Sequence, residues 1–242
     1  AEELILGCTD QDTWTYNPNA NFEDGSCSYE EFQVGAIGQG GIVFHIDTEN
    51  EIAYVAALED IGSYQWGCAN QINIPGADAT IIGSGLQNTL DIIAVNCPLG
   101  GGYEYGDQIW EGVNAAEAAF DYINESFIDW YLPSINELLA IHASIGPYSS
   151  FANIGNLNSY YISSSEFDDD DVWYLEVWNG NSYSTGKEYA YYVRPIRHFN
   201  YSSSGCTNLS AFNYQPSATE DDGSCIAVVE GCLNSWADNY NP

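Results

Sequence analysis

The sequence predicts an α+β domain flanked by small cysteine-stapled modules, and three observations support this prediction. Segments with strand-like and helix-like patterns are segregated along the central stretch rather than alternating, which is typical of the α+β class. A motif with two cysteines recurs near both ends of the chain, which indicates modular construction. The chain is 45% hydrophobic and 14% aromatic, so its central part can bury a sizeable core.

The central stretch opens with a predicted β-hairpin. Residues 41–46 and 52–57 are apolar and rich in β-branched side chains, as strands are. The polar residues 47–51 between them are typical of the connecting turn.

The first predicted helix follows Ser84. Ser84 and Gln87 have the spacing of a capping box, in which each side chain bonds the backbone N–H of the other residue. The apolar positions recur at intervals of four, three and four, as one face of a helix requires. These positions are Leu86, Leu90, Ile93 and Cys97.

Two further helices are expected before the last strands. One covers residues 113–124, and the other begins with a capping box of Ser134 and Glu137 and ends at Gly146-Pro147. The predicted buried positions are Ala116, Phe120 and Ile123 in the first of these helices, and Ile135, Leu138, Leu139 and His142 in the second.

The end of the central stretch is predicted to be β. Residues 160–164, 172–178 and 188–199 have the composition of strands. The dipeptide Asn179-Gly180 between two such runs favours a hairpin with a type I′ turn.

The cysteine motif occurs three times. Residues 7–27 and 205–225 are complete copies, and in each the second cysteine follows the first by 19 positions. We therefore predict a disulfide within each copy, and the two cysteines of the central stretch form a third candidate pair. An even framework in an acidic chain indicates an oxidising compartment, and the absence of CxxC or of a nearby histidine disfavours zinc. The three pairs are Cys8–Cys27, Cys206–Cys225 and Cys68–Cys97.

The copies divide the chain into four predicted parts. These are an N-terminal cysteine module at 1–32, a central domain at 33–200, a second module at 201–230 and the start of a third at 231–242. The third copy contains only Cys232, so we expect the polypeptide to continue to a partner cysteine 19 positions further on. The alternatives are a cross-link from Cys232 to a neighbouring subunit and a free thiol.

The charge of the chain excludes several classes of partner. There are 35 acidic residues and three strong bases, which gives a net charge of -32, so nucleic acid and anionic membranes are poor partners. No apolar run is long enough to span a membrane, so we expect no membrane insertion. No signal peptide is visible and no methionine occurs, so we expect that the chain has lost its start. Arg194 and Arg197 are expected to pair with carboxylates such as Glu166 or Glu137 rather than to bind a ligand.

The modules are rich in oxygen-bearing side chains that suit calcium. Ca²⁺ takes about six to eight oxygen ligands, and bound cations would offset the self-repulsion of the chain. The alternative is that these residues only build turns. The four aspartates at 168–171 have the same two interpretations, a metal site or a solvated loop. The predicted calcium ligands are Asp10, Asp12, Asn21, Asp24, Asn208, Asp221 and Asp222.

Four stretches of the central domain resemble a known family. They are GGIVFHID at 40–47, DWYLPSINEL at 129–138, YYISSSEFD at 160–168 and YYVRPIRHF at 191–199. In this order they look like the C-terminal domain of bacterial collagen-like adhesins of the Lcl type. The resemblance implies a C-type-lectin-like fold, export from a bacterium and a role in adhesion or glycan contact. The modules resemble a cysteine repeat, GCxDxxAxNYNPxAxxDDGSC, of exported bacterial surface proteins.

Two function classes are disfavoured by absent motifs. The Glu-Pro-Asn, Gln-Pro-Asp and Trp-Asn-Asp motifs of calcium-dependent lectins do not occur, and the net charge opposes the sulfated glycans to which the family has been linked. GxSxG and HExxH are also absent, and the three histidines are scattered. We therefore predict that the protein is not an enzyme.

These observations favour a secreted structural protein. We predict a subunit of an extracellular filament or matrix, in which copies of the chain assemble head to tail through the terminal modules. The alternative is a surface adhesin that binds a glycan or a protein. Three Asn-X-Ser sequons are candidate glycosylation sites. They are Asn124, Asn200 and Asn208.

Overall fold

The computed structural model describes most of the central domain and selected residues of the modules. The described residues are 4–9, 20–23, 33–69, 73–96, 99–100, 109–110, 112–124, 127–200, 204–206, 208, 210–211, 220–221, 223 and 225–226.

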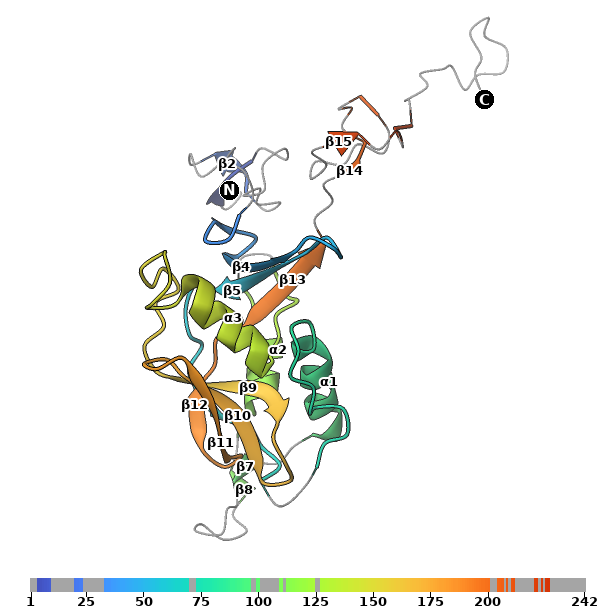
Figure 1. Ribbon diagram of the computed structural model, residues 1–242. Helices are drawn as coiled ribbons and strands as arrows, with labels where there is room; N and C mark the ends of the chain where they lie inside the picture. Colours follow the sequence, from blue (N-terminus) through green and yellow to red (C-terminus); the bar gives the residue numbers. More distant parts are fainter. Residues whose placement is uncertain are drawn as a thin grey trace, which may run out of the picture.

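Among the described residues between 33 and 200 there are two main β-sheets and three α-helices, an arrangement compatible with the predicted α+β class (Figure 1). The five-stranded sheet has the order β11-β10-β9-β12-β6, and the four-stranded sheet has the order β13-β5-β4-β3. The first consists of β6 (Ser63–Gln65), β9 (Tyr160–Glu166), β10 (Asp171–Glu176), β11 (Asn181–Gly186) and β12 (Ala190–Tyr192). The second consists of β3 (Ile37–Gly38), β4 (Gly41–Asp47), β5 (Ile52–Ala57) and β13 (Ile196–Asn200). The helices are α1 (Gly85–Val95), α2 (Ala115–Phe120) and α3 (Ile135–Ile145).

Helix α3 lies between the two sheets and joins them in one core (Figure 1). Its N-terminus has the predicted capping box, in which the Ser134 side chain accepts from the N–H of Glu137 and the Glu137 carboxylate accepts from the N–H of Ser134. The shared core draws on both sheets and on the helix, so removing water from all three surfaces stabilises them together. Its members include Ile42, Tyr54, Leu138, Ile141, Tyr161 and Leu175.

A second core covers the opposite face of the five-stranded sheet. Tyr161 and Ile162 are neighbours on β9, and they belong to different cores because successive side chains of a strand point to opposite faces. Helices α1 and α2 pack on the Ile162 face. The buried residues here include Trp66, Ile92, Ala115, Ala119, Ile162 and Val172.

Helix α1 forms as predicted, but its capping box and its buried face were predicted wrongly. The Ser84 hydroxyl makes no capping bond and donates instead to the carbonyl oxygens of Ala79 and Ile81. Of the predicted apolar stripe, Leu86 and Ile93 are only partly buried at the margins of the two cores, Leu90 is 39% exposed, and Cys97 lies outside the described residues. Buried polar side chains face inward because each bonds a backbone group there; Asn88, for example, donates to Ala79 O over 2.7 Å. The buried residues of α1 are Gly85, Asn88, Thr89 and Ile92.

The second helix is shorter than predicted. It begins at an Asn114–Glu117 capping box and ends at Phe120, and Ile123 beyond it is 65% exposed. The strong cap at Asn114 explains the later start, which lies two residues after the predicted one.

The predicted strand 188–199 is two strands that belong to different sheets. Strands β12 and β13 are separated at Pro195, which has no N–H to offer a continuous ladder. Strand β11 was not predicted, because its sequence NSYSTG is mostly polar. It pairs with β10 through a hairpin in which Gly180 has φ +68 but Asn179 does not have positive φ, so the turn is not type I′.

The two complete copies of the cysteine motif share a local pairing. Strand β1 (Leu6–Gly7) pairs in parallel with β2 (Phe22–Glu23), and β14 (Ser204–Gly205) pairs in parallel with β15 (Glu220–Asp221). These strands occupy equivalent positions of the motif, since each first strand directly precedes the first cysteine. The repeated sequence therefore produces a repeated backbone contact. The pair β7 (Leu99–Gly100) and β8 (Ile109–Trp110) stands apart from both main sheets.

Candidate functional site

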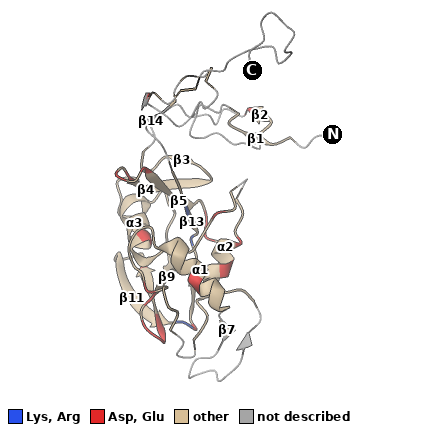
Figure 2. Cartoon of the chain, turned by 90° about the vertical axis from the view of Figure 1, so that its right-hand side faces the viewer, with Lys and Arg blue, Asp and Glu red and all other residues tan. Residues whose placement is uncertain are grey.

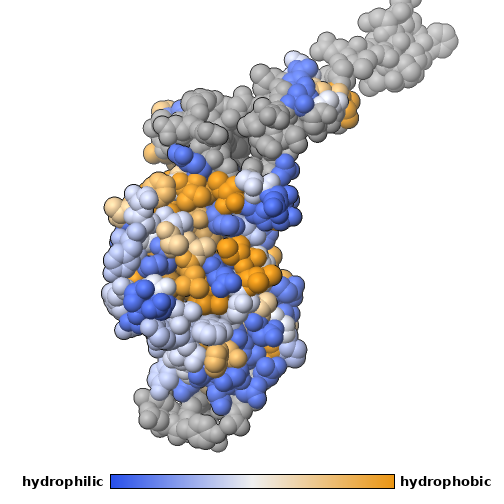
Figure 3. All heavy atoms as spheres, in the orientation of Figure 1, coloured by the Kyte–Doolittle hydropathy of each residue, from blue (hydrophilic) through white to orange (hydrophobic). Residues whose placement is uncertain are grey.

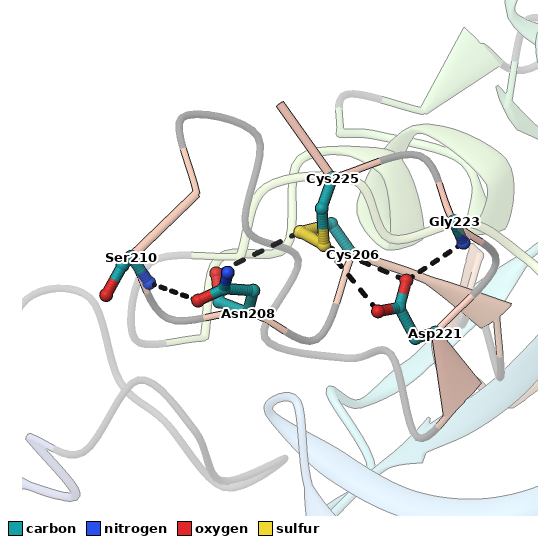
Figure 4. Close-up of a disulfide and its surroundings, with 6 residues drawn as sticks. All are labelled: Cys206, Asn208, Ser210, Asp221, Gly223 and Cys225. Carbon is teal, nitrogen blue, oxygen red and sulfur yellow. Dashed lines mark hydrogen bonds between the residues drawn. A yellow bond between two sulfur atoms is a disulfide. The ribbon is translucent and has the colours of Figure 1, made fainter. Parts of the chain in front are cut away.

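The second module contains a predicted disulfide. Cys206 and Cys225 are bonded over 2.04 Å, which confirms the pairing expected from the motif (Figure 4). Cys8 and Cys68 are also disulfide-bonded. Their predicted partners are Cys27 and Cys97, and these lie outside the described residues, as does Cys232.

The predicted calcium ligands that the structure describes accept hydrogen bonds from backbone N–H groups. Asp221 Oδ1 accepts from the N–H of Gly223, and Asn208 Oδ1 accepts from the N–H of Ser210, each over 2.9 Å (Figure 4). These two bonds suit the turn interpretation, and each oxygen keeps a further lone pair. Asn21 Oδ1 accepts from the backbone N–H of Ile5 over 2.9 Å, a contact between residues that are not in one turn. Asp10, Asp12, Asp24 and Asp222 lie outside the described residues.

The described residues do not bring metal ligands together. Within them, no three His, Cys, Asp or Glu side chains converge in the manner of a metal site. The loop at 168–171 is held by hydrogen bonds between one of its side chains and its backbone, since Asp168 Oδ1 accepts from the N–H groups of Asp170 and Asp171. Lys187 Nζ donates to the carbonyl oxygen of Asp169 over 2.7 Å and ties this loop to the sheet. Calcium binding by the modules stays a prediction.

All three strong bases of the chain are bound to carboxylates. Lys187 Nζ lies 2.5 Å from Glu166 Oε1, and both side chains are buried. Arg194 Nε donates to Asp60 over 2.7 Å. Arg197 makes two bonds to Asp129, of 2.6 and 2.8 Å. These pairs leave no strong base available for a polyanionic ligand.

The pairing of the arginines with carboxylates is confirmed, but both named partners were wrong. Glu166 pairs with Lys187, and Glu137 accepts from the N–H groups of Ser134 and Gly83. Burial raises the pKa of Glu137, against the effect of these bonds. The actual partners of the arginines lie far away in sequence, so spacing along the chain could not identify them.

The three sequons differ in the availability of their asparagine. Asn124 Nδ2 donates to the carbonyl oxygen of Gly40 over 2.6 Å, so this amide is engaged in the fold. Asn200 is exposed at the end of β13, and Asn208 is exposed in the second module.

A row of tyrosines on the five-stranded sheet is the candidate ligand-binding surface. We call it the tyrosine face, and it consists of Tyr160, Tyr174, Trp178, Tyr183 and Tyr191. The four tyrosines come from the four adjacent strands β9, β10, β11 and β12. Neighbouring rings lie close together: Tyr183 and Tyr174 at 6.0 Å, Tyr174 and Tyr160 at 5.9 Å, and Tyr160 and Tyr191 at 5.8 Å between centroids.

The tyrosine face remains open to solvent in spite of these contacts. Trp178 is 49% exposed, Tyr183 is 42% exposed and Tyr160 is 38% exposed. Partial burial raises the pKa of Tyr174, and the neighbouring Tyr191 and Glu176 raise it further. The Tyr174 hydroxyl therefore stays protonated at neutral pH and can donate a hydrogen bond.

Hydrogen bonds hold the rim of the tyrosine face in place. Tyr148 donates through its hydroxyl to the carbonyl oxygen of Trp178 over 2.8 Å. Asn179 Nδ2 donates to Glu176 Oε2 over 2.9 Å and lies 3.3 Å from the Tyr183 hydroxyl. The surface is therefore built on paired strands and a braced turn, which keeps its shape fixed before a ligand arrives.

Sequence reasoning missed the tyrosine face. The available signal was that aromatic residues recur at even spacings along the strands; Tyr174 and Trp178, for example, are four positions apart with Glu176 between them. That pattern shows only that the side chains share one face of a strand. Which strands stand side by side depends on the pairing of β12 with β9, and this pairing is not written in any local pattern.

The outward surfaces of the helices form a second unusual feature. Each helix contains one acidic residue, namely Asp91, Glu117 and Glu137, and Glu137 is fully buried. The helices are accordingly almost free of charge in Figure 2. Figure 3 shows apolar side chains gathered over α3 and the elements beside it. We call this surface the apolar helix face, and it consists of Ile52, Ile82, Leu86, Leu139 and Ala140, which pack on the shared core and are only partly buried.

Comparison with known proteins adds no family. No protein-family model matches this chain, and no curated protein sequence is similar to it. Among the described residues, none of the helices combines the length and the apolarity that a bilayer crossing requires.

Proposed function

We propose that this protein is an exported structural subunit that assembles with copies of itself into an extracellular filament or matrix. The apolar helix face is the observation that supports this most directly. A surface helix normally carries charge on its solvent side, and an uncharged helix surface is typical of a contact with another molecule. In a chain of net charge -32, it is also where two copies meet with the least repulsion.

Head-to-tail assembly requires a second surface that fits the first. The N-terminal module is the partner surface in this proposal, because Leu4, Leu6 and Phe22 are 65%, 54% and 55% exposed. A module of one copy would dock on the apolar helix face of the next copy. Such a contact joins two different surfaces and continues as an open filament unless the rotation closes it into a ring.

Other features of the chain support the same function. The central domain is proposed to be related to C-type lectins, as its resemblance to the collagen-like adhesins implies. The Cys206–Cys225 disulfide supports an extracellular or cell-surface location, because disulfides persist in oxidising compartments. Calcium bound to the modules would reduce the repulsion between copies.

Assembly can be measured on purified chains by sedimentation and electron microscopy. We expect assemblies that grow as salt is added, because salt screens the repulsion between acidic copies without weakening an apolar contact. Leu139→Glu places a charge on the apolar helix face, and Ala143→Glu does so at an exposed position one turn further along α3; each should abolish assembly. Tyr183→Glu adds the same charge on the five-stranded sheet and should leave assembly intact.

Two results would contradict assembly through the apolar helix face. Monomers at every protein and salt concentration, with and without calcium, would rule out a self-assembling subunit. Assembly that weakens with salt would indicate an ion-pair interface instead of the apolar helix face. Circular dichroism of each variant checks that the charge has not unfolded the domain.

A surface adhesin is the second candidate function. The tyrosine face favours it, since exposed aromatic rings with polar neighbours are typical of binding surfaces. An adhesive role is compatible with assembly, because the tyrosine face and the apolar helix face consist of different residues.

A further inference from the structure

We propose that the tyrosine face binds uncharged, chain-like polysaccharides by stacking successive sugar rings on its aromatic side chains. This inference rests on the adhesin candidate and specifies its ligand. It does not depend on self-assembly.

The arrangement of the rings suits a chain rather than a single small molecule. Tyr183, Tyr174, Tyr160 and Tyr191 follow the order of the strands β11, β10, β9 and β12, so the rings form a strip across the sheet. Tyr191 also stacks on Tyr174 with centroids 4.9 Å apart, so Tyr160, Tyr174 and Tyr191 contact one another and widen the strip into a cluster at this end. Trp178 extends it beside Tyr160, at 5.7 Å between centroids. A ligand that contacts all of these rings has to be extended.

The chemistry of the strip matches the two kinds of surface on a sugar ring. A pyranose presents apolar C–H groups on its faces and hydroxyl groups on its rim. Tyrosine and tryptophan offer a flat apolar ring together with a polar group at its edge. Polar partners for sugar hydroxyls stand beside the strip, namely Asn179, Glu176 and the Thr185 hydroxyl, which lies 3.1 Å from the hydroxyl of Tyr191.

The charges of the protein favour uncharged polysaccharides over acidic ones. Lys187, Arg194 and Arg197 are each bound to a carboxylate, so none of them is available to pair with a sulfate or uronate group. The Glu176 carboxylate borders the strip through its bond to Asn179, and the chain as a whole has a charge of -32. Acidic polysaccharides would be repelled, whereas a neutral chain meets no such repulsion.

Rigidity favours affinity on such an open surface. The four tyrosines project from hydrogen-bonded strands, and the Tyr148 hydroxyl braces the turn that presents Trp178. A preformed surface loses little conformational entropy when a ligand binds. The Asn179–Glu176 bond fixes the polar edge in the same way.

The test is affinity electrophoresis of the full chain through gels that contain one soluble polysaccharide each. The probes are hydroxyethyl cellulose and dextran as neutral chains, dextran sulfate as a polyanion and chitosan as a polycation. We expect retardation by a neutral chain, unchanged between about 0.05 and 0.5 M salt because no ion pair is involved. Fluorescence of Trp178 provides a second measurement in solution, compared with that of Trp178→Phe.

Variants identify the surface that binds. Trp178→Ala and Tyr183→Ser remove exposed rings, and we expect each to weaken binding about five- to tenfold, as the loss of one aromatic contact does. Tyr192→Ala is the matched control. Its ring is 42% exposed and sits on the same strand as Tyr191, but it points to the opposite face toward Tyr161 and should not affect binding.

Other results would overturn the inference. Retardation by dextran sulfate or chitosan alone, or binding that falls steeply with salt, would show recognition of charge. Equal binding by the ring variants and by wild type would place the site elsewhere, and the absence of binding to both neutral chains would contradict the proposed ligand class. Sedimentation of the same variants reports self-assembly separately, so failure of this inference is distinguishable from failure of the proposed structural role.

Discussion

The central domain and the cysteine modules are stabilised in different ways. The described part of the central domain has three clusters of buried hydrophobic side chains, and it contains a fully buried Lys187–Glu166 ion pair. The second module combines a two-residue strand pair with the Cys206–Cys225 disulfide. A segment of that size cannot bury enough apolar surface to fold by itself, so covalent closure takes the place of a core. One chain therefore contains a part whose stability depends on packing and a part whose stability depends on an oxidised disulfide.

The largest expected effect comes from breaking the buried ion pair. Lys187→Met should destabilise the central domain by about 3–5 kcal/mol, because it leaves the carboxylate of Glu166 buried without its cation. Urea unfolding followed by tryptophan fluorescence measures this loss. The double variant Lys187→Met with Glu166→Leu should recover much of it, since no charge is then left in the interior. A single variant as stable as wild type would show that Glu166 is neutral or hydrated in the folded chain.

Loss of the module disulfide should affect only the module. Cys206→Ala with Cys225→Ala is expected to cost the module about 3 kcal/mol, the loop-closure entropy for a cross-link of this span. Limited proteolysis should then cut within residues 205–225, while the urea midpoint of the central domain stays the same. A large fall in that midpoint would contradict the separation of the two regions.

Both acid and alkaline pH should lower the stability of the central domain. Burial lowers the pKa of His198 below its usual 6.5, so the folded state favours the neutral ring. On acidification the unfolded state takes up the proton first, and stability should fall as the pH drops below 6.5. Burial raises the pKa of Tyr131 and of Tyr161 above the usual 10.0. Above that pH the unfolded state ionises first, and stability should fall by about 1.4 kcal/mol per pH unit for each tyrosine.

Substitution of one tyrosine sharpens this pH prediction. The Tyr131 hydroxyl oxygen lies 3.0 Å from His198 Nδ1, so Tyr131→Phe should change the pH dependence of stability at both acid and alkaline pH. The alkaline slope should become shallower because one ionising group is gone. The measurement is urea unfolding at a series of pH values, and an unchanged alkaline slope would show that Tyr131 does not contribute.

The smallest expected effect concerns calcium and the modules. Calcium bound only to the folded modules would stabilise them by mass action. We expect a chelator to lower their melting temperature by several degrees at fixed ionic strength, and to leave the central domain unaffected. An unchanged melt in excess chelator would favour the turn interpretation, which the bonds of Asn208 and Asp221 already suit.

Local patterns predicted those elements whose physics is local. The capping box of Ser134 and Glu137, the hairpin of β4 and β5, and the Cys206–Cys225 pair each depend on residues at a short or repeated spacing. The face of α1 was predicted wrongly because buried polar side chains find donor or acceptor partners there: the Asn88 amide donates to Ala79 O and Ser164 Oγ, and the Thr89 hydroxyl donates to the carbonyl oxygen of Leu132. An apolar stripe indicates the buried face only where the interior offers no such partners.

Taken alone, the amino-acid sequence determined that the central stretch combines strands with helices, the repeated cysteine spacing and the strongly acidic charge, since each follows from composition or from neighbours along the chain. Only the tertiary structure decided which carboxylate pairs with each base, and which tyrosines stand side by side. Arg194 meets Asp60, and Tyr191 meets Tyr174, through strand pairings that join distant parts of the chain. Such contacts arise from the register and order of strands, and many registers are compatible with the same alternating pattern.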